Sequence, residues 1–307
     1  MWIGGLIAGC GDQLAGHADA EPVAVIDASS LDAPPPDATP ISGCHTSRNP
    51  TGAFAVTAVK AITATQPGNT WEAIAASWEA GYRYIEIDLR LSRDGRLIPG
   101  RFDDLSDFTD CRGSVRASDA ADLAVCHYRK APSVVVRPLV DGFVDGVDFD
   151  GIYLDLKFTA DDLPEEIEPG LAAVAGFRAA VSRPEGVLTM AYAPAFASAL
   201  IDAGERTGWK GYPDPSEAPA FVETGHDIGV EMICVEARSL DADLLDHSAE
   251  LGLWHLPWES VVETDNPLLN LLLDHGAGGL ITEAVDDVAA LVPPACDDDA
   301  RLFGRGG

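Results

Sequence analysis

The sequence predicts an α/β protein built as a (β/α)₈ TIM barrel, with a doubly wound open sheet as the alternative. From about residue 56 onward, short apolar runs typical of strands alternate with amphipathic stretches typical of helices, which indicates parallel βαβ units. About eight such strands over roughly 250 residues suit a barrel. The composition is globular, with 47% apolar and 23% charged residues in 307. Periodicity alone does not choose between the closed and the open sheet.

The expected elements follow one another in a regular order. Strands are predicted at 58–63, 82–91, 151–157, 186–192, 209–212, 230–236, 253–258 and 279–282. Helical spacing of apolar residues predicts helices at 69–80, 194–203, 240–251 and 266–275. We divide the chain into a signal-like segment (1–10), a tether and lead-in (11–55), the barrel (56–292) and a tail (293–307). In a barrel, catalytic residues gather at the carboxyl ends of the strands.

The N-terminal segment indicates export. Residues 1–9 are apolar, and Ile7-Ala8-Gly9-Cys10 resembles the lipobox of bacterial lipoproteins, in which the cysteine is lipidated after cleavage. No basic residue precedes Cys10, so a ragged apolar terminus is the alternative. The stretch to Pro40, rich in Asp, Ala, Pro and Ser, predicts a solvated tether. We expect a lipoprotein held at the cell envelope through Cys10, or a secreted protein. No apolar run is long enough to predict a membrane-spanning helix.

Charge and cysteine content exclude several classes of protein. The net charge of −30 repels phosphate backbones and excludes nucleic-acid binding, whereas an anionic substrate requires a bound cation. Five cysteines follow Cys10, and Cys111 with Cys126 is the favoured local disulfide in an oxidising compartment. At least one thiol then stays unpaired. No Cys/His spacing predicts a structural zinc site.

Two predicted strands carry the residues of a candidate metal site. Glu86 and Asp88 are two apart on one strand, so their carboxylates face the same way, and Asp155 and Lys157 repeat this spacing on another. Neighbouring carboxylates are costly to bury unless a cation lies between them, and oxygen ligands suit Mg²⁺ or Ca²⁺. We expect one such ion at Glu86, Asp88 and Asp155, with Lys157 stabilising phosphate charge as a catalytic residue. Solvated acidic residues and an internal salt bridge are the alternatives.

The order of these motifs resembles that of the glycerophosphodiester phosphodiesterase family. Its members carry His-Arg-Gly after a strand, Pro-Glu-Asn-Thr at a helix start, then Glu-x-Asp, an Asp-Gly turn, His-Asp and Glu-x-Lys. The similar segments here are Pro67-Gly68-Asn69-Thr70, Gly81 with Glu86 and Asp88, Asp94-Gly95, Arg137-Pro138-Leu139, Asp155-Leu156-Lys157 and His275 to Glu283. The resemblance covers about residues 56–292 and implies a barrel, a divalent cation and phosphodiester hydrolysis.

The two histidines that serve this family as general acid and base are missing at the matching positions. Counting along the chain puts the first at about Thr63 and the second at Arg101. Neither threonine nor arginine exchanges protons near neutral pH as imidazole does. We expect Arg101 to bind substrate, and we consider His45 and His255 as catalytic replacements. His45 qualifies only if a long insertion separates it from the helix start.

Three functions remain open on the sequence. The first is cation-dependent hydrolysis of glycerophosphodiesters at a reduced rate, with Trp258 packing against the glycerol or lipid moiety. The second is a catalytically silent barrel that binds a phosphorylated ligand or a partner. The third is a secreted phospholipase D-like enzyme. Each takes a small phosphodiester or lipid-derived ligand, and the chain lacks the motifs of P-loop enzymes, α/β-hydrolases and zincins.

Overall fold

The computed structural model describes residues 44–63, 66, 68–143, 147–157, 165–259 and 267–296. All of them belong to residues 37–307, one of the two units into which the chain divides. The lipobox with Cys10, the tether as far as Pro40, Pro67 and the tail from residue 297 lie outside the described residues. Nothing in the part of the chain that is described forms a helix long and apolar enough to cross a membrane.

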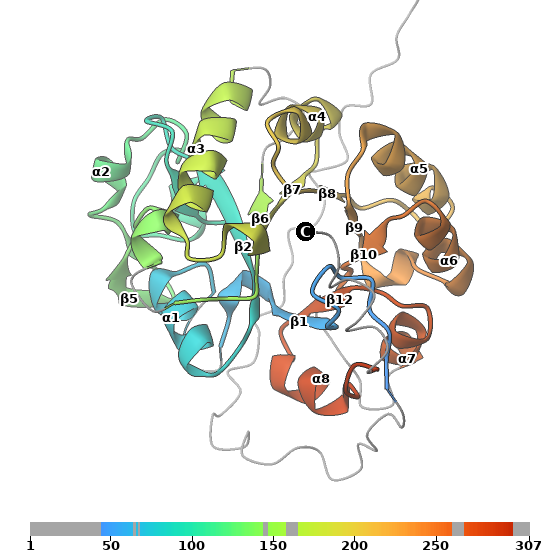
Figure 1. Ribbon diagram of the computed structural model, residues 1–307. Coiled ribbons are helices and arrows are strands. Elements are labelled where there is room, and N and C mark those ends of the chain that lie inside the picture. Colours follow the sequence, from blue (N-terminus) through green and yellow to red (C-terminus); the bar gives the residue numbers. More distant parts are fainter. Residues whose placement is uncertain are drawn as a thin grey trace, which may run out of the picture. The chain divides into compact units, whose positions relative to one another are not determined.

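A curled parallel sheet forms the centre of the fold, and helices lie outside it (Figure 1). Its strands are β1 (Ala55–Ala58), β2 (Tyr84–Leu91), β6 (Gly151–Leu156), β7 (Val187–Ala191), β8 (Thr207–Lys210), β9 (Met232–Cys234), β10 (Trp254–His255), β11 (Trp258–Glu259) and β12 (Gly279–Thr282). The order around the sheet is β10-β9-β8-β7-β6-β2-β1-β12-β11.

The sheet closes because β10 and β11 are consecutive parts of one extended segment. On one side β10 pairs with β9, and the Trp258 N–H donates to the Val235 carbonyl at 3.1 Å. On the other side β11 pairs with β12, and the Gly278 N–H donates to the His255 carbonyl at 2.9 Å. The segment therefore joins the two ends of the sheet. The expected barrel is confirmed, and the open-sheet alternative is wrong.

The helices connect the strands in the expected alternation, with one exception. They are α1 (Trp71–Glu79), α3 (Ile167–Ala180), α4 (Pro194–Asp202), α5 (Ala218–Ile228), α6 (Ala242–Glu250), α7 (Pro267–Asp274) and α8 (Val285–Leu291). Between β2 and β6 an insertion takes the place of a long helix. It contains β3 (Leu97–Pro99), α2 (Ala120–Leu123), β4 (His127–Tyr128) and β5 (Ala131–Val135). Its own small core lies around Leu105, Leu123 and Val136.

The first strand ends earlier than the sequence suggests. We expected a strand at 58–63, but β1 ends at Ala58 and a short 3₁₀ turn follows at Val59–Ala61. Lys60 and Ala61 have φ values of 55° and 49°, in the left-handed region. An extended strand cannot pass through that region, so the chain turns out of the sheet here. The turn leaves Val59 and Lys60 at the carboxyl end of the barrel.

The described residues contain two disulfides, one within the insertion and one that joins segments far apart in the sequence. Cys111–Cys126 confirms the local pair expected from the sequence and closes a loop within the insertion. Cys44–Cys296 joins the lead-in to the segment after α8, and His45 there forms a bridge with Ala295. Cys234 is a free, buried thiol on β9.

Candidate active site

Strand alternation points the acidic side chains into the barrel. Along β2, Ile85, Ile87 and Leu89 pack in the main core cluster, which β2 shares with helices such as α1 and α4. The residues between them face the barrel interior, where Tyr84 packs against other interior side chains. Because side chains alternate along a strand, Glu86 and Asp88 lie on the interior side with Tyr84. The spacing seen in the sequence therefore delivers both carboxylates to the barrel axis.

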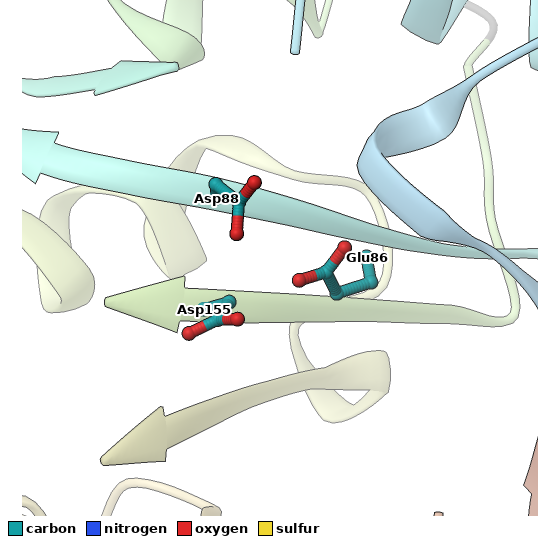
Figure 2. Close-up of side chains that lie close together, drawn as sticks. All are labelled: Glu86, Asp88 and Asp155. Carbon is teal, nitrogen blue, oxygen red and sulfur yellow. The ribbon is translucent and has the colours of Figure 1, made fainter. Parts of the chain in front are cut away.

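The three acidic residues come together as expected. Asp88 on β2 lies opposite Asp155 on the neighbouring strand β6. One oxygen of each of Glu86, Asp88 and Asp155 lies within 4.8 Å of the others, and Figure 2 shows the three carboxylates gathered on the two strands. Their exposed fractions are 1%, 2% and 0%. This carboxylate cluster is a buried set of oxygen donors at the carboxyl end of the sheet.

Two lysine ammonium groups contact the carboxylate cluster. Lys157 Nζ lies 2.8 Å from Asp88 Oδ1 and 2.5 Å from Asp155 Oδ2. Lys210 Nζ, from the end of β8, also contacts Asp155 Oδ2 and lies 3.6 Å from Glu86 Oε1. Lys157 was expected here, whereas sequence reasoning missed Lys210. The strand predicted at 209–212 puts Lys210 near its start, whereas β8 ends at Lys210 and so brings this side chain to the carboxyl end of the barrel.

Burial and charge set the protonation of these groups. Burial, followed by the charge of Asp88, raises the pKa of Glu86 to about 8. Burial also disfavours charge on Asp155, yet Lys157 and Lys210 hold the pKa of Asp155 below its usual range. Burial opposes charge on both lysines, but Asp155 raises each lysine pKa, most strongly that of Lys210. Both ammonium groups therefore stay protonated, and Glu86 takes up a proton near neutral pH unless another cation approaches.

The donor set fits a divalent cation. When all three carboxylates are ionised, they exceed the two ammonium groups by one negative charge, which a bound cation would compensate. Asp155 Oδ1 is buried without a hydrogen-bond partner, and a buried carboxylate oxygen without one is costly. Oxygen-only donors suit a hard cation. A candidate acidic metal site is thus present at Glu86, Asp88 and Asp155.

Backbone and amide groups hold the carboxylates in place. The Lys60 N–H donates to Glu86 Oε2 at 2.9 Å, from the turn that follows β1. Asn69 Nδ2 donates to Asp88 Oδ2 at 2.9 Å, and the Asp88 N–H donates to Asn69 Oδ1 at 3.0 Å. Asn69 has φ 58° and directly precedes Thr70, which caps α1. The Asn-Thr pair in the sequence therefore has two roles, since one residue orients a carboxylate and the next begins a helix.

A cavity of about 260 Å³ opens over the carboxylate cluster. Its lining includes Glu86, Asp88, Arg101, Lys157, Lys210 and Trp258, together with Val59, Lys60, Tyr212, Glu259 and Glu283. Arg101 and Trp258, both expected to contact substrate, thus lie on the cavity. Among the described residues that line it there is no histidine. The turn after β1 contributes Val59 and Lys60 to the lining, whereas Thr63 is not among the lining residues.

His45 and His255 do not lie on this cavity, which corrects the expectation for both. His45 Nδ1 lies 2.7 Å from the Pro293 carbonyl, and its Nε2 accepts the Phe54 N–H just before β1, at the amino end of the barrel. His255 points out of the barrel, where its Nε2 lies 2.7 Å from Ser248 Oγ on α6. Burial lowers the pKa of His255 to about 3. Both imidazoles therefore hold the scaffold together and do not reach the carboxylates.

Comparison with known proteins gives a consistent result. Residues 60–162 match the model of the glycerophosphoryl diester phosphodiesterase family, a range that includes Glu86, Asp88, Asp155 and Lys157. No curated protein matches the chain.

Solved structures resemble the fold over most of its length. A putative glycerophosphoryl diester phosphodiesterase from Agrobacterium tumefaciens is 19% identical, with a TM-score of 0.66 over 78% of this chain and 97% of that one. One from Silicibacter pomeroyi is 17% identical, with a TM-score of 0.65 over 79% and 96%. A phosphodiesterase from Oleispira antarctica, in complex with the product sn-glycerol-3-phosphate, is 18% identical, with a TM-score of 0.62 over 76% and 95%. Residues 60–162 thus match the glycerophosphoryl diester phosphodiesterase family model, and the chain shares the barrel fold of these solved structures.

Proposed function

We propose that the chain hydrolyses glycerophosphodiesters with one bound Mg²⁺ or Ca²⁺, and that it does so slowly. The observation that carries this proposal is the convergence of Glu86, Asp88 and Asp155 with two ammonium groups at one cavity. The match of residues 60–162 to the family model supports the reaction class, and the similar Oleispira antarctica phosphodiesterase was solved in complex with its product sn-glycerol-3-phosphate.

The chain's own residues account for binding and charge stabilisation. Lys157 and Lys210 offer protonated amines to the oxygens of a phosphodiester, and Arg101 adds a guanidinium at the cavity wall. A divalent cation held by Glu86, Asp88 and Asp155 would supply further positive charge toward the phosphate. Trp258 and Tyr212, in edge contact with ring centroids 6.0 Å apart, offer apolar surface to an alcohol moiety. These groups favour the additional negative charge that develops as the phosphorus–oxygen bond breaks.

The described residues of the cavity offer no evident general acid or base for proton transfer. Tyr192 donates to Asp155 Oδ2 at 3.1 Å, but burial raises its pKa well above the usual value, so the phenol does not serve as a base near neutral pH. Both lysines are protonated and cannot accept a proton. With no imidazole among the described residues of the cavity, each missing acid or base forfeits about 10²–10⁴-fold in rate.

The same observation favours a second candidate function, a barrel that binds a phosphorylated ligand without turnover. The two ammonium groups and the cation site serve binding as well as catalysis, whereas imidazoles serve only catalysis.

Release of glycerol 3-phosphate from glycerophosphocholine and glycerophosphoethanolamine tests both functions. We expect slow release with Mg²⁺ or Ca²⁺ that stops with EDTA and in Glu86→Gln. Sphingomyelin and lysophosphatidylcholine are assayed in parallel. Hydrolysis of these lipids faster than of the glycerophosphodiesters would favour the phospholipase D-like alternative. Calorimetric binding of glycerol 3-phosphate without any turnover would favour the silent barrel.

We also propose that the protein is exported and held at the cell envelope through lipidated Cys10. Two disulfides among the described residues support an oxidising compartment. Incorporation of labelled palmitate into the wild type and not into Cys10→Ala is the expected result in a bacterial host. Equal labelling of both, or of neither, contradicts the anchor.

A further inference from the structure

A second cavity lies beside the first on the insertion side. Its volume is about 360 Å³, and it shares Lys60 and Arg101 with the cavity over the carboxylate cluster. Arg129 and Lys130, from the turn between β4 and β5, complete its charged wall together with Asp107. We call this cavity the basic groove. Because two residues line both cavities, the cavities adjoin at Lys60 and Arg101.

The charge of the basic groove is opposite to that of the chain. The protein has 20 Lys and Arg against 50 Asp and Glu, yet four cationic side chains meet here with a single carboxylate. In the part of the chain that the structure describes, none of Lys60, Arg101, Arg129 and Lys130 forms an ion pair with an acidic residue. A chain with excess acid would readily supply such partners. Arg129 lies near enough to Asp104 for their charges to interact. The positive charge offered to a ligand in the groove therefore comes chiefly from Lys60, Arg101 and Lys130.

The groove also offers a flat apolar surface beside this charge. Phe102 is 48% exposed, and the Arg101 guanidinium lies over its ring at 5.9 Å from the centroid. A ring-shaped alcohol could rest against this surface while a charged substituent meets the cations. Arginine and lysine together are typical partners of phosphate oxygens.

We propose that the basic groove binds a second anionic group on the substrate, a phosphomonoester carried by the alcohol that is esterified to glycerol phosphate. The proposal rests on the hydrolytic function given above. The diester itself lies over Lys157 and Lys210, and the glycerol arm carries no charge. The arm that enters the groove is therefore the other alcohol, and four cations favour one that bears a phosphate over one that does not.

A matched pair of substrates tests this inference. Glycerophosphoinositol and glycerophosphoinositol 4-phosphate differ by one phosphomonoester, so kcat and KM are measured for both by the release of glycerol 3-phosphate. We expect a KM about tenfold lower for the phosphorylated compound at similar kcat, because several exposed charge contacts each contribute a few-fold. Equal KM values, or a lower KM for the unphosphorylated compound, would overturn the proposal.

Two variants that each remove one positive charge distinguish binding in the basic groove from a general attraction of anions to the protein. Lys130→Gln removes a cation from the groove, and Arg112→Gln removes an exposed cation of the same insertion that does not line it. We expect Lys130→Gln to lower the ratio of the two KM values about threefold and Arg112→Gln to leave this ratio unchanged. Both variants should have the same melting temperature as the wild type. A similar loss in both variants would indicate non-specific steering and contradict the groove.

Calorimetric titration of both compounds, with EDTA present to prevent turnover, distinguishes the two proposals. Suppose that the phosphorylated compound binds more tightly but neither compound is hydrolysed when Mg²⁺ or Ca²⁺ is present. This result would contradict the hydrolytic function and support the basic groove as an anion site. Hydrolysis of both compounds with no binding preference would retain the function and overturn the groove.

Discussion

Lys210 places a second ammonium group against Asp155 and beside Glu86, in the position where a cation would share the same oxygens. Its charge therefore competes with a metal ion for the carboxylate cluster. The lysine stabilises the protein without metal, and a bound cation must displace or share this contact. The affinity of the proposed site for a cation would therefore depend on a residue that is not itself a ligand.

Replacing this lysine tests the competition. In Lys210→Met we expect the Kd for Mg²⁺ or Ca²⁺ to fall about tenfold or more, because one positive charge beside the ligands is gone. The metal-free variant should lose about 2–3 kcal/mol of stability, since Asp155 loses one of its two ammonium partners and keeps Lys157. Thermal shifts over a metal titration measure both effects, with Lys130→Met as the surface control. Unchanged or weaker metal affinity would show that Lys210 does not oppose the ion.

His255 gives a prediction about pH. Burial lowers its pKa from 6.5 to about 3, so between these values the unfolded chain binds a proton that the folded chain does not. Its contribution to stability is therefore complete above pH 6.5 and is lost as the pH falls toward 3. Between pH 7 and pH 5 the wild type should lose about 2 kcal/mol more than His255→Gln in urea unfolding. Equal losses in the two proteins would contradict a buried neutral imidazole.

Part of the residue-level site could be predicted and part could not. Glu86, Asp88 and Asp155 followed from alternation, because spacing by two fixes which strand face a side chain occupies. The same rule places His255 between Trp254 and Leu256, both of which face the barrel interior, and so points His255 away from it. Lys210 has no charged residue two positions away on its own strand, so alternation did not single it out. Its role becomes clear only from its contact with Asp155 on β6 in the folded protein.

The start of α1 links a helix to the site. Thr70 Oγ1 accepts the Ala73 N–H at 3.0 Å as an N-cap, and Asn69 exchanges two hydrogen bonds with Asp88. Asparagine is among the few residues that tolerate φ 58°, and its amide satisfies both the backbone and the carboxylate of Asp88. This short segment fixes both where the helix begins and how one carboxylate points.

Two variants at this position separate backbone strain from side-chain bonding. Asn69→Ala should lose about 2–4 kcal/mol, because bonds to a buried carboxylate and a tolerated left-handed conformation are both lost. Asn69→Gly should lose about 1 kcal/mol less, since glycine adopts this backbone freely. Urea unfolding measures both, and weaker cation binding should accompany each. Stability equal to the wild type in Asn69→Ala would contradict the role of this amide.

Element boundaries were harder to predict than element types. The sequence placed the first strand at 58–63, because Ile62 continues an apolar run. Nothing in the run itself reveals that Lys60 and Ala61 turn out of the sheet, which the contact between the Lys60 N–H and Glu86 stabilises. The insertion between β2 and β6 likewise follows no simple period. Its short strands pair locally and are fixed by their own core and by Cys111–Cys126.

At the level of the whole molecule, the two disulfides restrain the unfolded chain to different extents. Cys44–Cys296 joins residues 252 apart, and Cys111–Cys126 residues 15 apart. In the chain-entropy model, Cys44→Ser/Cys296→Ser should cost about 5–6 kcal/mol and Cys111→Ser/Cys126→Ser about 3 kcal/mol. Urea unfolding without reductant measures the difference. If neither pair of substitutions lowers stability, or if the shorter loop costs more, this account of the disulfides is wrong.

The α/β class of the fold could be predicted because strands and helices alternate over most of the barrel. The closure of the sheet could not be predicted from this alternation. Closure depends on residues 254–259 pairing with β9 on one side and β12 on the other, a relation between distant segments. The net charge of the chain likewise predicted only part of the site. An excess of acid predicted the need for cations at a phosphate site, but not that Lys157, Lys210, Arg101 and Lys60 would gather around one cavity.

The central claim is that the cavity combines a candidate cation site with phosphate-binding charge, while no histidine is among the described residues that line it. The most direct test is kcat for glycerophosphocholine, measured for the wild type and for Val59→His/Arg101→His beside the Oleispira antarctica phosphodiesterase. We predict a slow wild type whose activity EDTA abolishes, and a gain of about 100-fold or more when both histidines are introduced. A wild type as fast as the relative, or one indifferent to EDTA, would contradict the claim.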